Sequence, residues 1–382
     1  SRFSNLPLKR MESRVVEALR LGAYQLVFLD RIPHSAAVNS AVELTRKHCK
    51  NPRAAGMVNG ILRSLERALD QLPTIPQSDL VSYLSTLYSH PEWLVQEFLS
   101  TIGMEETAGL LAANNSRPAI TAMVNTTKTT AQGLTDALEE EGVSVSPHPW
   151  LKDCLILEKT GDLEGRRAFQ EGLFYIQDPA SRLSVQVLDP QPGMRVLDVC
   201  AAPGGKSFGT AIRMESRGEV ISCDLHPHKR KLIQSGAARL GLEIITPMTA
   251  DGKAFRPEWE GAFDRVLVDA PCSGLGVIRK KPDIRFKDPE PLKELPGVQR
   301  EILSNAARYV KPGGVLVYST CTILRRENEE VVMDFLAARK DYKAEAFTLP
   351  GPVGEIQAGM GTLWPHRHGT DGFFICKLRR EG

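Results

Sequence analysis

The stretch RVLDVCAAPGGKS, residues 195–207, joins an apolar, β-branched segment to a glycine turn and then to a helical segment. Gly204 and Gly205 allow a tight turn and let a ligand approach the backbone closely. The free N–H groups at the start of the following helix favour an anionic group such as a carboxylate. The dinucleotide pattern G-x-G-x-x-G is absent. The turn alone therefore leaves two interpretations open, an ordinary turn or a ligand site.

The same alternation of apolar and helical segments continues downstream. Four more apolar, β-branched segments follow residues 195–199, at 219–224, 243–251, 263–270 and 313–321. Buried strands that alternate with helices are typical of a parallel sheet covered on both faces. The sequence therefore predicts an α/β fold for this part, and the segments YKAEAFTL and DGFFICKL near the C-terminus are candidates for two further strands.

The first half of the chain follows other patterns. Apolar residues recur at spacings of three and four over residues 11–70, which predicts a small helical bundle, and helix continues over 80–115. The segments AITAMVNT and CLILEK read as strands on either side of a helical stretch, which suits a small α+β subdomain. We therefore expect three parts, at residues 1–75, 76–180 and 181–382, with the proline-bearing segment 72–79 as a linker candidate.

Composition excludes several classes of protein. Hydrophobic residues make up 42% and charged residues 25%, both typical of globular proteins. No run of about 18 apolar residues occurs and the start lacks the apolar stretch of a signal peptide, so we expect no membrane span. The net charge of +2 is uneven, because residues 1–75 carry 12 basic and 6 acidic side chains while residues 76–180 carry 6 and 15. Basic segments are compatible with a nucleic-acid partner.

The cysteines argue against disulfides and metal clusters. The chain has 7 of them, widely spaced and without a CxxC pair. We therefore expect no metal and a reducing, cytoplasmic setting. In such a setting most cysteines are small buried apolar residues, as we expect for Cys200 and Cys223.

Acidic residues follow the predicted strands. Asp198, Asp224, Asp251 and Asp269 stand at the ends of four consecutive segments. Each could be a helix N-cap. Ligands of open parallel sheets bind outside the carboxyl ends of the strands, where an acid can accept hydrogen bonds from ribose hydroxyls. Together the four acids predict one crevice.

Two further cysteines follow the fourth and fifth of these strands. Cys272 stands in DAPCSG and Cys321 in YSTCT, and we expect both at the crevice because these strands are expected neighbours. A thiolate that adds to carbon 6 of cytosine makes carbon 5 reactive, so two thiols facing one pyrimidine suit covalent catalysis. Asp269 is the candidate for stabilising the adduct near ring nitrogen 3, and Lys206 is the candidate for favouring the thiolate.

A basic loop, GVIRKKPDIRFK at residues 276–287, follows Cys272 closely. Charge alone favours a solvated loop, whereas its position favours contact with phosphates. The candidate RNA-binding residues are Arg279, Lys280, Lys281 and Arg285. Phe286 and Tyr318 are candidates for stacking on a base that swings out of its own stack.

Taken together these motifs resemble the RsmB/Sun branch of the RNA 5-cytosine methyltransferases, within the wider Nop/Sun family. The resemblance covers about half of the chain and rests on QDPAS, DVCAAPGGKS, DAPCSGLGVIRKKPDIR, YSTCT and HGTDGFF. It implies a Rossmann-like methyltransferase domain whose cofactor is S-adenosylmethionine. The residues implied to hold this cofactor are Cys200, Ala201, Ala202, Pro203, Gly204, Gly205, Lys206, Asp224, Asp251 and Asp269. It also implies that Cys321 is the nucleophile and that Cys272 assists product release, whereas DNA 5-cytosine methyltransferases attack with the other cysteine.

The N-terminal part is similar to the NusB-like RNA-binding domain of the same branch, on residues 19–48 and 58–65. The match begins late, so we expect the first helices of that domain to lie outside the chain. By analogy with this branch, the presence of the domain favours small-subunit ribosomal RNA as the substrate. We also expect the protein to be a monomer. The alternatives are a transfer-RNA or DNA 5-cytosine methyltransferase and a non-catalytic RNA-binding assembly factor.

Overall fold

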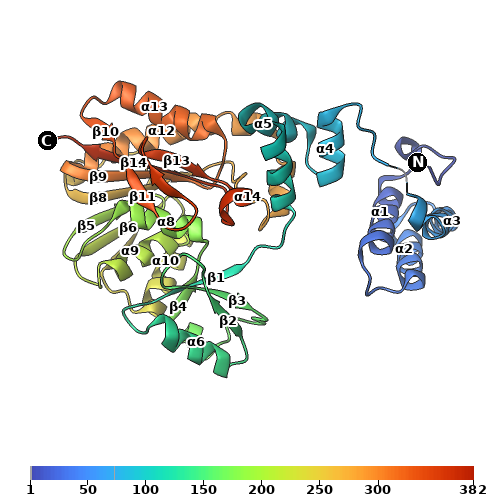
Figure 1. Ribbon diagram of the computed structural model, residues 1–382, viewed down its shortest axis with the longest axis horizontal. Coiled ribbons are helices and arrows are strands. Elements are labelled where there is room, and N and C mark those ends of the chain that lie inside the picture. Colours follow the sequence, from blue (N-terminus) through green and yellow to red (C-terminus); the bar gives the residue numbers. More distant parts are fainter. Residues whose placement is uncertain (1, 73) are drawn as a thin grey trace. The chain divides into compact units, whose positions relative to one another are not determined.

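The computed structural model describes residues 2–72 and 74–382 and divides into two compact units, Ser1–Ser78 and Asp79–Gly382 (Figure 1). The first unit is helical, with apolar residues such as Val15, Leu19 and Leu26 on one face of the first long helix. This spacing buries one stripe of each helix against the other two. The helices are α1 (Ser13–Phe28), α2 (His34–His48) and α3 (Ala54–Glu66), with 3-10 turns η1 (Leu8–Arg10) and η2 (Leu69–Gln71).

A helical pair opens the second unit. Helices α4 (Leu80–Tyr88) and α5 (Glu92–Asn114) replace the single stretch expected over 80–115, because the chain turns between Ser89 and Pro91. Asp79 caps α4 by accepting a hydrogen bond from the backbone N–H of Val81. The pair packs against the loops that follow the cysteines, through Leu275, Ile278, Ile323 and Leu324.

An antiparallel subdomain follows, as the strand and helix patterns predict. Its sheet has the order β2-β3-β1-β4, and one face packs on α6 while Met123, Cys154 and Tyr175 on the other join the core of the next sheet. Its elements are β1 (Ile120–Val124), α6 (Ala131–Glu140), β2 (Ser144–Pro147), β3 (Cys154–Glu158), α7 (Arg167–Gln170) and β4 (Phe174–Ile176).

The C-terminal part is an α/β sheet, which confirms the predicted fold class. Its order is β10-β14-β9-β8-β5-β6-β7, with β13 beside β14. Strands β5 to β9 pair in parallel and β14 runs antiparallel to β9. The strands are β5 (Arg195–Asp198), β6 (Glu219–Asp224), β7 (Ile245–Thr249), β8 (Phe263–Asp269), β9 (Val310–Thr320), β10 (Tyr342–Ala344), β13 (Met360–Leu363) and β14 (Phe373–Arg380). DGFFICKL thus forms most of β14, whereas YKAEAFTL splits between β10 and the short strand β11.

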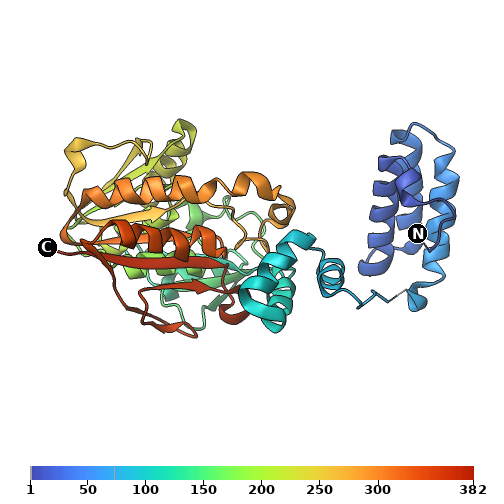
Figure 2. The ribbon, with the colours of Figure 1, turned by 90° about the horizontal axis from the view of Figure 1, so that it is seen from above.

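Helices cover both faces of this sheet, and Figure 2 shows two of them running along one face. One layer holds α8 (Pro179–Leu188), α9 (Gly205–Arg213) and α10 (Pro227–Leu240), and the other holds α12 (Leu295–Ala306) and α13 (Glu329–Ala338). The smaller elements are η3 (Pro257–Trp259), η4 (Pro282–Phe286), α11 (Pro289–Leu292), η5 (Ala307–Tyr309), η6 (Arg325–Glu327), β11 (Phe347–Leu349), β12 (Gly354–Ile356) and α14 (Pro365–His368). Because β5 lies between β6 and β8, the strand order reverses there, which is where open sheets bind ligands.

Candidate active site

The two cysteines of the conspicuous motifs lie in contact. Cys321 directly follows β9 and Cys272 follows β8, and their sulfur atoms are 3.2 Å apart. Strands β8 and β9 are neighbours and parallel, so their carboxyl ends carry the two thiols to the same edge. The expected convergence of the two thiols is confirmed.

Charge around the sulfur pair is asymmetric. The hydrogen bond with the Cys272 thiol lowers the pKa of Cys321, helped by the Lys206 ammonium and opposed by burial and Asp269. The same hydrogen bond and burial raise the pKa of Cys272. Of the two thiols, Cys321 is therefore the one that the site favours as a thiolate, the nucleophilic form of cysteine.

Asp269 and Lys206 form an ion pair beside the thiols. The Lys206 ammonium lies 2.6 Å from one carboxylate oxygen of Asp269, and the Ser319 hydroxyl donates to the other oxygen at 2.8 Å. The ammonium also lies 5.1 Å from the centre of the Phe373 ring. These contacts hold the carboxylate at the end of β8, where it borders two separate cavities.

A cavity of about 330 Å³ lies at the carboxyl ends of the strands. Of the residues predicted to hold the cofactor, Cys200, Ala202, Asp224, Asp251 and Asp269 line it. The others, Ala201, Pro203, Gly204, Gly205 and Lys206, do not. Leu225, Val298 and Ile302 complete an apolar part of the wall. Acids for ribose hydroxyls beside apolar side chains for a purine ring fit an adenosine-containing cofactor.

Asp198 corrects the prediction that four acids share the crevice. Its carboxylate is buried beneath the glycine turn, where it accepts a hydrogen bond from the Ser207 hydroxyl at 2.7 Å, and Ser222 in turn donates to Ser207. Its other oxygen has no hydrogen-bond partner in the part of the chain that the structure describes. Burial raises the pKa of Asp198 from 3.8 to about 7. This acid supports the turn from inside and does not face a ligand.

The titration of Asp198 makes folding stability depend on pH. A carboxyl group whose pKa is raised in the folded state contributes stability below its unfolded pKa, and this contribution is lost as the pH rises through the folded value. The asparagine side chain of Asp198→Asn stays neutral at every pH. The free energy of unfolding of the variant therefore rises relative to that of the wild type as the pH increases from about 4 to about 7. Urea unfolding over this range measures the difference. A difference that does not change with pH would contradict the assignment.

A second cavity, of about 560 Å³, lies on the other side of Cys321. Pro203, Lys206, Asp269 and Phe373 line it on the side of the α/β sheet. Ile120, Ile176 and Gln177 line it from the antiparallel subdomain. Cys321 and Asp269 line both cavities, so a bound cofactor and a second molecule can both reach them.

Three of the four cations predicted to contact phosphates in the basic loop have partners within the protein. Arg279 and Lys280 are each paired with both Asp178 and Asp371, at 2.5 to 3.3 Å. Arg285 is buried and donates to the backbone carbonyl of Ser89 and to the side chain of Asn115, which ties the loop to α4 and α5. These three cations hold the fold together. Of the four candidates, only Lys281 is exposed at the cavity without an ion pair among the described residues.

The two stacking candidates lie elsewhere. Tyr318 is 0% exposed, and its hydroxyl donates to the backbone carbonyl of Glu327. Phe286 is 64% exposed but lines neither cavity. The aromatic residue in the lining of the cavity of about 560 Å³ is Phe373, which the motif HGTDGFF contains.

A buried network around Cys272 was missed by the sequence analysis. The Glu327 carboxylate accepts hydrogen bonds from the backbone N–H of Ser273 at 2.8 Å and from the Gln299 amide at 3.0 Å. The Gln299 amide also donates to the backbone carbonyl of Pro271. Glu327 therefore fixes the backbone on both sides of Cys272. It stands in the charged run RRENEE, which reads as a solvated helix start, so no local pattern marks it as buried.

Glu327→Ala removes the acceptor for two buried donors. We expect a loss of folding stability on the order of 1–3 kcal/mol, because unpaired buried polar groups keep their full desolvation cost. The control is Glu330→Ala, an exposed acid three residues along, which we expect to change stability little. Urea unfolding of both variants measures the effect. Equal midpoints for the two variants would show that the network around Cys272 does not bear on stability.

The fold and site together define a class of protein. A parallel sheet with an adenosine-type cavity at its switch point, beside a thiol pair, is the arrangement of a Rossmann-like methyltransferase. A family model described as 16S rRNA methyltransferase RsmB/F matches residues 185–379, and models of a RsmF/B-like ferredoxin-like domain and of the NusB family match residues 90–164 and 1–67.

Relatives extend this match over the full length. A probable ribosomal RNA small subunit methyltransferase B of Bacillus subtilis is 41% identical over 100% of this chain and 86% of its own. A protein of the same description from Synechocystis is 35% identical over 98% of this chain and 85% of its own. The chain belongs to the RsmB/F family of methyltransferases, and S-adenosylmethionine is its cofactor.

Solved structures share the fold. The crystal structure of PH0851 is 29% identical, covers 99% of this chain and 85% of its own, and has a TM-score of 0.82. NSun6 from Pyrococcus horikoshii is 23% identical over 78% of this chain and 100% of its own, with a TM-score of 0.70, and supports the fold alone. No described helix is long and apolar enough to cross a membrane.

Proposed function

We propose that this protein transfers a methyl group from S-adenosylmethionine to carbon 5 of a cytosine in small-subunit ribosomal RNA. The main support is the distance of 3.2 Å between the sulfurs of Cys272 and Cys321. The two thiols lie beside one cavity that fits the cofactor, and Cys321 also lines a second cavity that could hold the target base. The substrate follows from the names of the full-length relatives, which act on small-subunit ribosomal RNA.

Cofactor binding uses the smaller cavity. Asp224 and Asp251 would accept hydrogen bonds from the ribose hydroxyls of the cofactor, and the apolar side chains of Leu225 and Ile302 would pack on its purine. Each of these acids keeps one carboxylate oxygen for the ligand, because its other oxygen accepts a backbone N–H, from His226 for Asp224 and from Lys253 for Asp251. The cofactor, when bound, supplies an electrophilic methyl group.

The chain's own side chains carry out the covalent steps. The Cys321 thiolate adds to carbon 6 of the cytosine, and the electrons of the ring double bond make carbon 5 nucleophilic. Nitrogen 3 takes a proton from solvent as the thiolate adds, and the Asp269 carboxylate, held by Lys206 and Ser319, accepts a hydrogen bond from it and so orients the ring. After carbon 5 has been alkylated, its proton leaves to a base, the bond from sulfur to carbon 6 breaks, and the double bond returns. Cys272 touches the departing sulfur and assists this release.

RNA binding and catalysis belong to different parts of the chain. Residues 1–75 form an RNA-binding domain, residues 76–180 link it to the catalytic part, and residues 181–382 perform catalysis. RNA is the macromolecular partner, with the enzyme acting as a monomer in the cytoplasm. The basic N-terminal part, with 12 basic and 6 acidic side chains, supports RNA binding through the attraction of phosphates.

Separate substitution of the two cysteines tests the roles. With 16S rRNA and S-adenosylmethionine, Cys321→Ala forms no covalent protein–RNA complex, because the attacking thiolate is missing. Cys272→Ala allows a complex to accumulate, because release is slowed. Denaturing gel electrophoresis of radiolabelled RNA detects the complex, with the buried Cys376→Ala as the control. The reverse pattern would assign the nucleophile to Cys272.

Cofactor binding is tested by thermal unfolding. A ligand that binds only the folded state stabilises it by about 2.7 kcal/mol at a hundredfold excess over its Kd. We expect S-adenosylmethionine to raise the Tm of the wild type by several degrees and to raise that of Asp224→Ala much less. Asp162→Ala, an exposed acid outside the cavity, keeps the full shift. A full shift in Asp224→Ala would remove this acid from the cofactor site.

A further inference from the structure

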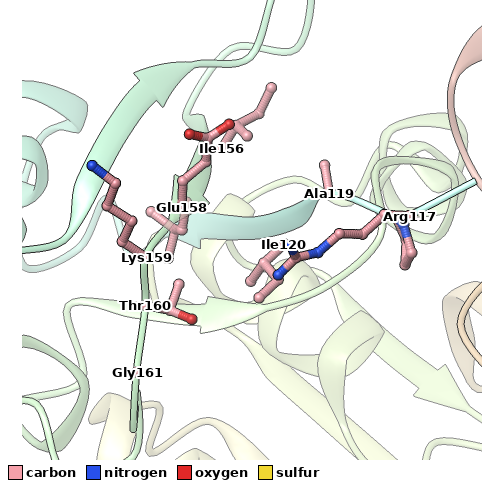
Figure 3. Close-up of a pocket in the computed structure, with 10 residues that line it drawn as sticks. Arg117, Ala119, Ile120, Ile156, Glu158, Lys159, Thr160 and Gly161 are labelled. Carbon is pink, nitrogen blue, oxygen red and sulfur yellow. The ribbon is translucent and has the colours of Figure 1, made fainter. Parts of the chain in front are cut away.

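A cavity outside the thiol site, of about 620 Å³, opens between the start of β1 and the segment that follows β3 (Figure 3). Pairing of these two strands begins at Ile120 and Leu157, and the residues beyond this pair separate. Pro118, Ala119 and Ile120 line both this cavity and the one that contains Cys321. The two cavities therefore adjoin along one continuous wall.

Two exposed isoleucines line the cavity of Cys321, and one of them, Ile120, also lines the new cavity. Ile120 is 36% exposed and Ile176 is 45% exposed, and both line the cavity of Cys321. They lie on adjacent strands, since Ala122 in β1 is directly opposite Ile176 in β4. Single exposed apolar side chains are ordinary, but two of them on the rim of a catalytic cavity give a surface suited to the face of a base.

Uncompensated positive charge accompanies this apolar surface. Among residues 2–72 and 74–382, Arg117 and Lys159 in the new cavity have no ion-pair partner, in contrast to Arg279 and Lys280. Glu158 is the acid in the same lining. In Figure 3 the Arg117 side chain extends back alongside Ile120, whereas Glu158 and Lys159 point away from Arg117. Arg117 is thus the cation placed beside the shared wall.

We propose that this cavity is a subsite for the nucleotide next to the target cytosine. The neighbouring base packs on Ile120, which lines both cavities, and the phosphate that joins the two nucleotides meets the Arg117 guanidinium. This subsite rests on the proposed function, because it takes the cytosine to be in the cavity of Cys321. Its ligand is a single-stranded, splayed segment of RNA, since both bases must leave their stacks to reach the protein.

The subsite divides the work of binding between the two parts of the second unit. The α/β sheet supplies the thiols and the cofactor cavity, whereas the antiparallel subdomain supplies Arg117, Ile120 and Ile176. Contacts to a base face are tolerant of sequence, because every base has one. The subsite therefore increases the affinity for RNA and positions the target cytosine along the strand. The chemical step takes place at the thiol site.

The test uses the full chain and three short RNA substrates. The methylated cytosine is first located in 16S rRNA, and a short single-stranded RNA spanning it is then made intact or with an abasic residue at the 5′ or the 3′ neighbour. The variants are Arg117→Ala and Ile120→Ala, with Lys152→Ala as an exposed lysine outside both cavities. We expect each test variant to lower kcat/KM about tenfold through KM, with the single-turnover rate at saturating RNA unchanged.

The abasic substrates identify the contact. One of the two abasic RNAs lowers kcat/KM of the wild type about tenfold, and Ile120→Ala lowers it little further on that RNA, since both changes remove the same contact. The subsite would be overturned if the losses in kcat/KM from the abasic residue and from Ile120→Ala were additive, or if the test variants matched Lys152→Ala. In either case, methylation of 16S rRNA by the wild type would leave the proposed function standing. A wild type that does not methylate 16S rRNA would overturn both.

Discussion

The site depends on the contact between the sulfurs of Cys272 and Cys321. Two side chains that are 49 positions apart meet because β8 and β9 are parallel neighbours whose carboxyl ends form one edge of the sheet. The same edge carries the cofactor cavity, since the strand order reverses beside β5. One property of parallel sheets thus brings the two thiols and the cofactor cavity together.

The surroundings make the two thiols chemically different. Lys206 and Asp269 lie on the side of Cys321, whereas the buried Glu327 holds the loop of Cys272 from the other side. The hydrogen bond between the sulfurs lowers the pKa of Cys321 and raises that of Cys272. A thiolate next to a protonated thiol is the arrangement that attack followed by assisted release needs. These directions agree with the proposed roles of Cys321 in attack and Cys272 in release.

Local sequence patterns predicted the fold and the centre of the site. They did not predict the roles of side chains whose partners lie far away in the sequence. Strand periodicity, the turn at Gly204 and the motifs of Cys272 and Cys321 are continuous in sequence, so they are readable there. The roles of Arg279 and Lys280 depend on Asp178 and Asp371, which lie about 100 and 90 positions away. Charge shows that a side chain needs a partner, but it does not show whether a carboxylate of the fold or a phosphate of RNA supplies it. Asp198 and Tyr318 likewise change from candidates for ligand contact to buried supports only in three dimensions, and the burial of Glu327 has no local sign in the sequence.

The central claim is that Cys321 makes the bond to the cytosine while Cys272 stays free beside it. RNA that carries 5-fluorocytosine at the target position traps the adduct, because fluorine on carbon 5 cannot leave as the proton does. Proteolysis and mass spectrometry of the trapped complex locate the modified residue. The account predicts that the nucleotide is attached to the peptide of Cys321, with the peptide of Cys272 unmodified. Attachment to Cys272 would contradict it.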